Sequence, residues 1–243
     1  MTPSAEDSSA ATPLSYGTPD APRVAVRGEA LLEFDPEIAR IAVTVSARGT
    51  DRRAALEDLT RRNARALELV KGYGGDAVEK LETGAFSVQP VLTAKGRREQ
   101  VHAYHGRVRV QAVVADFTVL GELTTALADL ELTQVEGPWW SLRPDSPAHR
   151  AARQQAVREA VTRAREYAEA LDARLVALVE LADLGAENAG QPPFPPAPGG
   201  MARAAFAGDA TESAAPALDL EPQRQTVRAQ VNARFVMSPP VLG

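Results

Sequence analysis

The sequence predicts an α+β fold, in which a mixed or antiparallel sheet has its helices packed on one face. Two observations support this prediction. Segments in which apolar and polar residues alternate, as in half-buried strands, recur along the chain, and segments with the apolar spacing of amphipathic helices lie between them. From the second predicted strand onward, which begins at about residue 41, the segments follow the order β-α-β-β-α-β, the split β-α-β arrangement, and an added α-β-β comes after it.

The composition is that of a globular protein with a core of its own. The chain has 243 residues, of which 44% are hydrophobic and 24% charged. A net charge of −5 is unfavourable for nonspecific binding of nucleic acid, so we expect no nucleic-acid partner. The absence of cysteine excludes disulfides and thiolate chemistry. No stretch of about 18 apolar residues occurs, so we expect no membrane span.

The domain organisation follows from shifts in composition. We predict a disordered N-terminal tail over 1–22, one α+β domain over 23–184 and 222–237, a Pro/Gly/Ala-rich mobile loop over 185–221 and a C-terminal tail over 238–243. The first of these segments lacks the basic and apolar regions of a secretory signal. We therefore expect a cytoplasmic protein.

Residues 24–72 are predicted to form a β-hairpin followed by a long helix. Two alternating strands flank the turn dipeptide Asp35-Pro36, and Gly28 in the first strand is a candidate bulge or point of close approach. Thr50 or Asp51 can cap the start of the helix with a side-chain oxygen. Three glycines are expected to stop the helix by adopting positive φ angles: Gly72, Gly74 and Gly75.

The later elements follow the same two periodicities. Asp116 is predicted to cap a leucine-rich helix, and Ser146-Pro147 is predicted to open a long helix that packs closely on the sheet. The apolar stripe of this long helix comprises Ala152, Ala156, Ala160, Ala164, Tyr167 and Leu171. The expected strands are 81–92, 101–115, 133–142, 175–182 and 227–235. We expect strand 175–182 to lie in the core and strand 227–235 to close the sheet.

Four segments carry motifs that occur together in one family. The first segment contains Val24, Val26, Gly28-Glu29, Asp35-Pro36, Ala39, Val43, Val45, Gly49, Ala55-Leu56 and Val70-Lys71. The others are Thr83-Gly84-Ala85-Phe86-Ser87-Val88-Gln89-Pro90, the strand that begins Tyr104-His105-Gly106, and the helix with Ala152-Arg153, Ala156-Val157, Ala160, Ala164 and Ala168. Over about residues 23–237 the chain thus resembles the SIMPL-domain family.

The resemblance implies association rather than catalysis, because the family offers no catalytic residue to carry over to this chain. Its bacterial members are commonly exported to the envelope, some form ring- or channel-like oligomers, and others are linked to stress defence. An animal member is a kinase-associated signalling adaptor. Two positions depart from the family pattern: Asp35-Pro36 inverts the usual Pro-Asp, and Asp172-Ala173-Arg174 replaces the usual glycine after the long helix.

Groups suited to catalysis or metal binding do not converge in the sequence. His102 and His105 have a spacing that suits a metal site on a helix, but a strand directs them to opposite faces. The acidic residues around the predicted hairpin are interpreted as solvated turn charges; they are Glu29, Glu33, Asp35 and Glu37. We therefore predict that the protein is not an enzyme and has no catalytic residue, metal or cofactor.

The candidate interface residues are Trp139, Trp140, Arg107 and Arg109. Adjacent strand residues point to opposite faces, so one tryptophan is expected in the core and the other at the surface or an interface. Arg107 and Arg109 belong to a basic patch with Lys95, Arg97, Arg98, His102 and His105. This patch is interpreted either as a solvated hairpin or as a contact for an acidic partner or nucleic acid.

These observations favour a non-enzymatic, SIMPL-like domain. It is expected to act by self-assembly, as a homo-oligomer, or by association with a protein partner, in stress- or envelope-related physiology. The alternative is a small-molecule or peptide-binding module that uses a cleft near the 185–221 loop. The Pro-rich run at residues 194–198 of that loop is interpreted as a spacer rather than a polyproline ligand.

Overall fold

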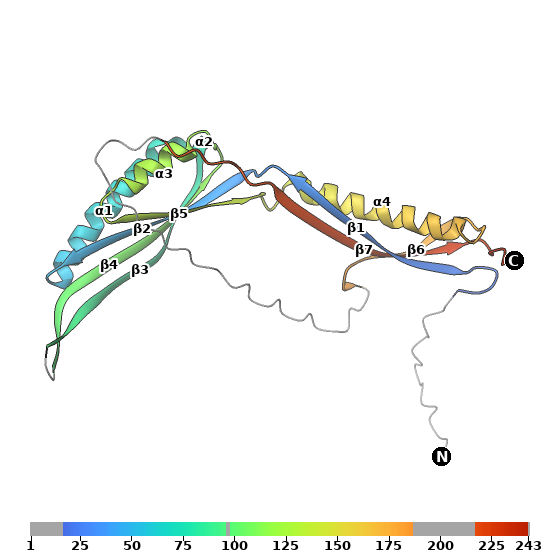
Figure 1. The fold of residues 1–243 in the computed structure, drawn as a ribbon, viewed down its shortest axis with the longest axis horizontal. Coiled ribbons are helices and arrows are strands. Elements are labelled where there is room, and N and C mark those ends of the chain that lie inside the picture. The colour runs from blue at the N-terminus through green and yellow to red at the C-terminus, as the bar shows by residue number, and fades with distance from the viewer. Residues whose placement is uncertain (1–16, 96–97, 187–216, 243) are drawn as a thin grey trace, which may run out of the picture. The chain divides into compact units, whose positions relative to one another are not determined.

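The computed structural model of the chain describes residues 17–95, 98–186 and 217–242, and it confirms the predicted α+β fold class. The strands form two antiparallel sheets, each with helices packed on it (Figure 1). The sequence predicted one domain, whereas the described residues cluster in two compact units. The split β-α-β unit contains the described residues of 33–146 and 217–225, and the α4 unit contains those of 17–32, 147–186 and 226–242.

The split β-α-β unit has a four-stranded sheet with the strand order β3-β4-β2-β5. Its elements are β2 (Ile38–Gly49), α1 (Arg52–Gly72), α2 (Gly74–Ala77), β3 (Val78–Lys95), β4 (Arg98–Val114), α3 (Leu120–Ala128) and β5 (Thr133–Ser141). Strand β4 lies between β2 and β3 and pairs antiparallel with both. This insertion of a strand between the two that flank α1 confirms the predicted split β-α-β arrangement.

The core of this unit lies between the sheet and the two longer helices. Strand β2 directs Ile41, Val43 and Val45 toward α1 and α3, where they are fully buried. In Figure 1 both helices lie on the same face of the sheet. The opposite face, which we call the open face, carries none of the helices described for this unit. Near the C-terminal end of this unit, the amide of Leu218 donates to Thr125 Oγ1 of α3 at 3.2 Å.

The predicted start of α1 is correct, whereas the predicted glycine stop of α1 and the predicted cap of α3 are wrong in part or in full. Asp51 caps α1 by accepting a hydrogen bond from the Ala54 amide at 2.9 Å. Of the three glycines expected to adopt positive φ, only Gly74 does so, at 78°, because α1 continues through Gly72 and α2 begins directly after Tyr73. Asp116 does not cap α3. Its carboxylate accepts from the amide and hydroxyl of Thr118, and the helix begins later, at Leu120.

The α4 unit has a three-stranded sheet with the order β1-β7-β6. Its elements are β1 (Arg23–Phe34), α4 (Pro147–Glu169), β6 (Leu175–Asp183) and β7 (Gln225–Met237). The predicted N-terminal hairpin is therefore wrong, because β1 pairs with β7 while β2 pairs with β4 and β5. The Asp35-Pro36 turn joins strands of two different sheets. A turn dipeptide therefore does not show that the strands on either side of it pair with each other.

Helix α4 packs on this sheet through an alanine stripe. Ala152, Ala156, Ala160 and Ala164 are buried as predicted, and Ala168 continues the stripe. Tyr167 was predicted to belong to the stripe but is 54% exposed, because the buried positions recur every fourth residue and skip it. Figure 1 shows α4 along one face of the β1-β7-β6 sheet.

Strand β6 was predicted to lie in the core, and this prediction is wrong. The buried residues of the main core of this unit come from β1, β7 and α4, and only Leu175 of β6 packs against them. Most other residues of β6 are exposed. The strand order explains the difference, since β6 lies at the edge of the sheet and an apolar sequence does not reveal whether a strand is central or at an edge.

Candidate interaction surfaces

The two adjacent tryptophans of β5 lie on opposite sides of the sheet, as the strand period requires. Trp140 packs against the core, where its ring meets that of Phe117 edge to face at a centroid distance of 4.8 Å. Trp139 is 48% exposed and lines a groove on the open face. Of the predicted interface residues, Trp139 is thus accessible to a partner, whereas Trp140 contributes to the core.

The open-face groove has a volume of about 960 Å³ and runs across all four strands of the sheet. Its polar lining includes Arg40 of β2, Glu82 of β3 and Arg109 of β4. Arg40 lies opposite Trp139 in the β2-β5 ladder. The strand alternation that buries Val108 and Val110 toward the helices directs Arg107 and Arg109 to the open face. The structure therefore brings three of the four predicted interface residues to the same face.

Ion pairs occupy three of the carboxylates around this groove. Glu136 accepts from Arg109 at 2.9 Å, and Glu82 pairs with Lys80 at 2.8 Å. Glu79 is paired with Arg143, whose guanidinium pKa it raises. Arg40 and Arg107 are exposed, and neither forms an ion pair with any residue that the structure describes. The face thus offers guanidinium groups that are available to an anion.

The other members of the predicted basic patch are Lys95, Arg97, Arg98 and two histidines. The side chains of residues 93–100, which include Lys95, Arg97 and Arg98, lie outside the described part of the chain. His102 and His105 lie on β4 three positions apart, and the strand period separates their side chains. Within the described ranges, no group of three or more His, Asp or Glu residues could hold a metal ion.

The acidic residues around the predicted hairpin all have partners, and Glu33 and Asp35 share one. Glu29 accepts from Gln230 at 3.1 Å, and Glu33 and Asp35 lie within 3.5 Å of Arg224. Glu37 accepts from the Ser146 hydroxyl at 2.7 Å and from the Arg143 amide at 2.9 Å. The structure therefore shows them as pairs that fasten strands and turns, and it does not bring them together as a carboxylate pair.

A second surface runs along the edge of β6, which we call the β6 edge. It consists of the exposed apolar side chains of Val176, Leu178, Val179, Leu181 and Leu184. Val176 is the most exposed of them, at 67%. The register of the β6-β7 ladder shifts around Val176 and again around Val179, so two bulges interrupt the pairing. The sequence did not indicate this surface, because its apolar residues were assigned to the core.

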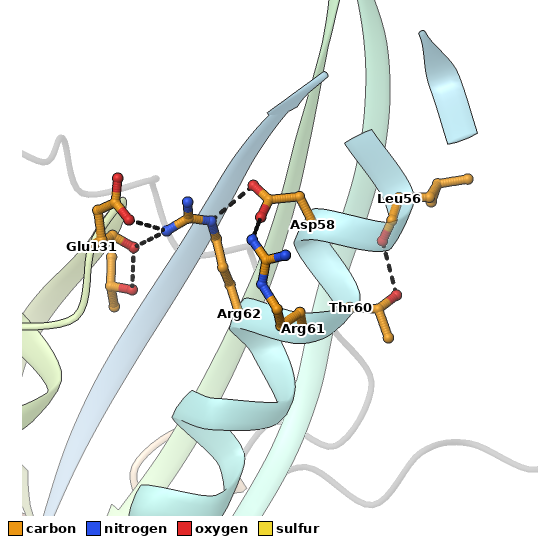
Figure 2. Close-up of polar contacts among 7 residues, drawn as sticks. Leu56, Asp58, Thr60, Arg61, Arg62 and Glu131 are labelled. Atoms are coloured by element: carbon orange, nitrogen blue, oxygen red, sulfur yellow. Dashed lines mark hydrogen bonds and ion pairs between the residues drawn. The ribbon is translucent and has the colours of Figure 1, made fainter. Parts of the chain in front are cut away.

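A charged cluster on the helix side fastens α1 to the segment before β5 (Figure 2). Arg62 donates to Asp58 at 2.8 Å and, through a second nitrogen, to the Glu131 carboxylate at 3.0 Å. The hydrogen bond with Asp58 is the main reason that the pKa of Arg62 is raised. Asp58 also pairs with the exposed Arg61. Every charge of this cluster has an opposite charge beside it, so the cluster is a structural one.

The predicted cleft near the 185–221 loop falls largely on residues 187–216, which lie outside the described ranges. That alternative stays a prediction. Among the described helices, none is long and apolar enough to cross a membrane.

The fold and these surfaces define an α+β protein of two units. One is a split β-α-β unit with an open sheet face, and the other has an apolar strand edge. The family model "SIMPL: Protein of unknown function (DUF541)" matches residues 24–235, and the chain belongs to this family. A search among curated proteins gives no match.

Proposed function

We propose that this SIMPL-family protein acts by association with a second copy of itself through the β6 edge, and that it catalyses no reaction. The stress- or envelope-related setting expected from the family resemblance is part of this proposal. The observation that carries it is the row of exposed apolar side chains along a single edge strand. Monomeric proteins rarely expose large contiguous apolar patches, and such patches mark surfaces that another molecule covers.

The chemistry of the β6 edge favours contact through side chains. Burying one valine or leucine contributes about 1.5–3 kcal/mol, so a few of these residues supply a useful driving force. The carboxylate of Glu180, in the middle of β6, is held by Arg234 at 2.5 Å. Its charge is therefore already paired and need not oppose the burial of its neighbours. The bulges at Val176 and Val179 make a long continuous ladder across the edge less favourable than side-chain packing.

A second copy fits this edge because two identical strands related by a two-fold axis run antiparallel. The same apolar row then meets itself, and this symmetric contact occupies the β6 edge of both copies. Placing the axis near Val179 brings Leu178 and Leu181 of the two copies within reach of each other across the strands. This arrangement predicts a dimer as the smallest assembled unit.

The test is to measure the molar mass by multi-angle light scattering over a range of micromolar concentrations. We expect a dimer or a multiple of it for the native chain. Leu178→Lys and Leu181→Lys place a charge in the contact, and each is expected to weaken the assembly at least about tenfold, which corresponds to about 1.4 kcal/mol. The matched control is Leu31→Lys, since Leu31 is equally apolar and 68% exposed but lies on β1.

Two results would contradict the proposal. A native chain that stays monomeric throughout this concentration range would remove self-association altogether. Dissociation by Leu31→Lys with no effect of the two β6 variants would place the contact on the opposite edge of the sheet. Circular dichroism of each variant checks that the fold is retained.

A further inference from the structure

We propose that the open-face groove of the split β-α-β unit binds an acidic peptide segment of a partner protein, with an apolar side chain of that segment placed against Trp139. This inference goes beyond self-association and does not depend on it, because the groove and the β6 edge lie in different units. It rests on the side chains that the strands present on the open face.

The geometry of the strands fixes where these side chains lie. Val108, Val110 and Ala112 of β4 are buried toward the helices, so Arg107, Arg109 and Gln111 alternate with them on the open face. Arg40 joins this row from β2, next to Trp139 of β5. The cations are thus carried by backbone that is hydrogen-bonded on both sides within the sheet, which fixes their positions more firmly than a loop would.

Charge decides which ligands the groove favours. Glu136, Glu82 and Glu79 already pair with Arg109, Lys80 and Arg143. The carboxylate of Asp145, which also lines the groove, acts on the charge of the same Arg143. Arg40, which lines the groove, and Arg107, which lies on the same face two positions along β4 from the lining residue Arg109, have no such pair among the described residues. This face therefore has cationic groups to spare in a chain whose net charge is −5. Carboxylates of a ligand can form the charge-assisted hydrogen bonds that these guanidinium groups lack. The complementary ligand is therefore anionic.

The apolar part of the lining adds a second requirement. Trp139 is 48% exposed, and Ile38 and Pro144 also line the groove. An exposed tryptophan ring gains free energy when an apolar group covers it. A ligand that satisfies both the guanidinium groups and the ring has carboxylates next to an apolar side chain, as acidic peptide segments do.

Nucleic acid fits the same face less well. Sheets that bind single strands stack bases on aromatic side chains of their central strands. On the open face the central strands present Arg40 from β2 and Arg107 and Arg109 from β4, and the aromatic ring that lines the groove, that of Trp139, lies on the outer strand β5.

The test uses a short fluorescein-labelled peptide of aspartate and glutamate with one central leucine, and measures its anisotropy on titration with the full chain. We expect saturable binding that weakens as salt is raised. A peptide with lysine in place of each acidic residue should not bind. Arg40→Glu and Arg107→Glu are each expected to weaken binding about tenfold. Arg65→Glu, the control, makes the same charge change at an exposed arginine of α1 and should leave binding unchanged.

A second readout reports the location of the bound peptide. The chain has two tryptophans, so Trp140→Phe leaves Trp139 as the one fluorescent indole. We expect its emission to shift to shorter wavelength when the unlabelled acidic peptide covers the ring. If this variant unfolds, Trp139→Ala in the anisotropy titration answers the same question, because it should weaken binding without altering the fold.

Three results would overturn the proposal. The first is the absence of saturable peptide binding at low salt. The second is an equal loss of affinity in Arg65→Glu and Arg40→Glu, which would indicate attraction by overall charge. The third is tighter binding of a single-stranded oligonucleotide than of the peptide, with the same dependence on Arg40 and Arg107, which would assign the face to nucleic acid.

Discussion

A Cβ atom on Gly28 of β1 would lie 2.0 Å from the carbonyl oxygen of Ala156 in α4, closer than any nonbonded contact that proteins tolerate. It would also lie 2.7 Å from the Ala160 Cβ. Glycine on the strand and alanine on the helix together allow this close approach, since any larger side chain would force the two elements apart. The Gly28-Glu29 motif of the family resemblance is thereby explained as a packing requirement.

Gly28→Ala is expected to destabilise the α4 unit by about 2–3 kcal/mol, because the added methyl group overpacks a site made of backbone. Gly72→Ala is the matched control, since a Cβ atom there meets nothing within 4 Å and alanine favours the helix. Urea unfolding followed by circular dichroism measures both. Equal stability of the two variants would show that β1 and α4 can separate at little cost.

Trp140→Ala should cost about 2–3 kcal/mol, because it removes the edge-to-face contact with Phe117 and leaves a cavity beside the core. Trp139→Ala should change the free energy of unfolding by less than about 0.5 kcal/mol, since its ring projects into the open-face groove. Chemical denaturation of the two variants makes the comparison. A large loss in Trp139→Ala would mean that this ring supports the fold.

The hydrogen bonds of Thr118 lower the pKa of Asp116, the side-chain hydroxyl contributing most. Thr118→Ala should therefore raise that pKa toward its ordinary value of 3.8, which NMR titration of the carboxyl group can measure. A carboxylate with a lowered folded-state pKa stabilises the protein above the unfolded-state pKa and loses this effect as the pH falls through the folded-state pKa. The stability difference between native and variant should thus be present at neutral pH and vanish in strong acid.

Local signals of the sequence predicted the elements well, and long-range pairing was where they failed. Asp51 caps α1 and the alanine stripe of α4 is buried as expected, because both depend on neighbours within a few residues. The pairing of β1 with β7 joins residues such as Arg27 and Asn232, which lie far apart in the chain. A turn dipeptide between two alternating strands is as compatible with a hairpin as with two strands of different sheets. Because neighbouring strands usually pair, the sequence alone favoured the wrong partner for β1.

The candidate surfaces show the same division. Alternation along a strand predicted that one tryptophan of β5 would be buried and the other exposed, although it did not determine which. The sequence did not reveal the β6 edge, because the apolar run that contains Val176, Leu178 and Leu181 was interpreted as a buried strand. Only the strand order, which depends on where β7 returns, shows that these side chains lie at an edge.

Arg62 joins α1 to the segment before β5, and its side chain is only 18% exposed (Figure 2). Arg62→Met keeps the aliphatic part of the side chain but removes the hydrogen bonds to Asp58 and Glu131. We expect a loss of about 1–2 kcal/mol, measured by urea unfolding, because Asp58 loses its better-buried partner. Arg53→Met is the control, since its pair with Glu57 is exposed and should contribute little. Similar losses in both variants would contradict a special role of the cluster.

Asp172 occupies the position after α4 where the family resemblance expects glycine, and its φ of 51° lies in the left-handed region. The next residue, Ala173, donates its amide to the Ala168 carbonyl at 2.8 Å, so the helix end requires this conformation. Asp172→Gly should therefore stabilise the protein by about 0.5–1 kcal/mol, because glycine adopts positive φ without steric cost. Asp172→Ala should destabilise it, since alanine has neither the freedom of glycine nor a polar side chain to bond the nearby backbone. Thermal unfolding of the two variants measures the order, and a more stable alanine variant would show that the helix end rearranges.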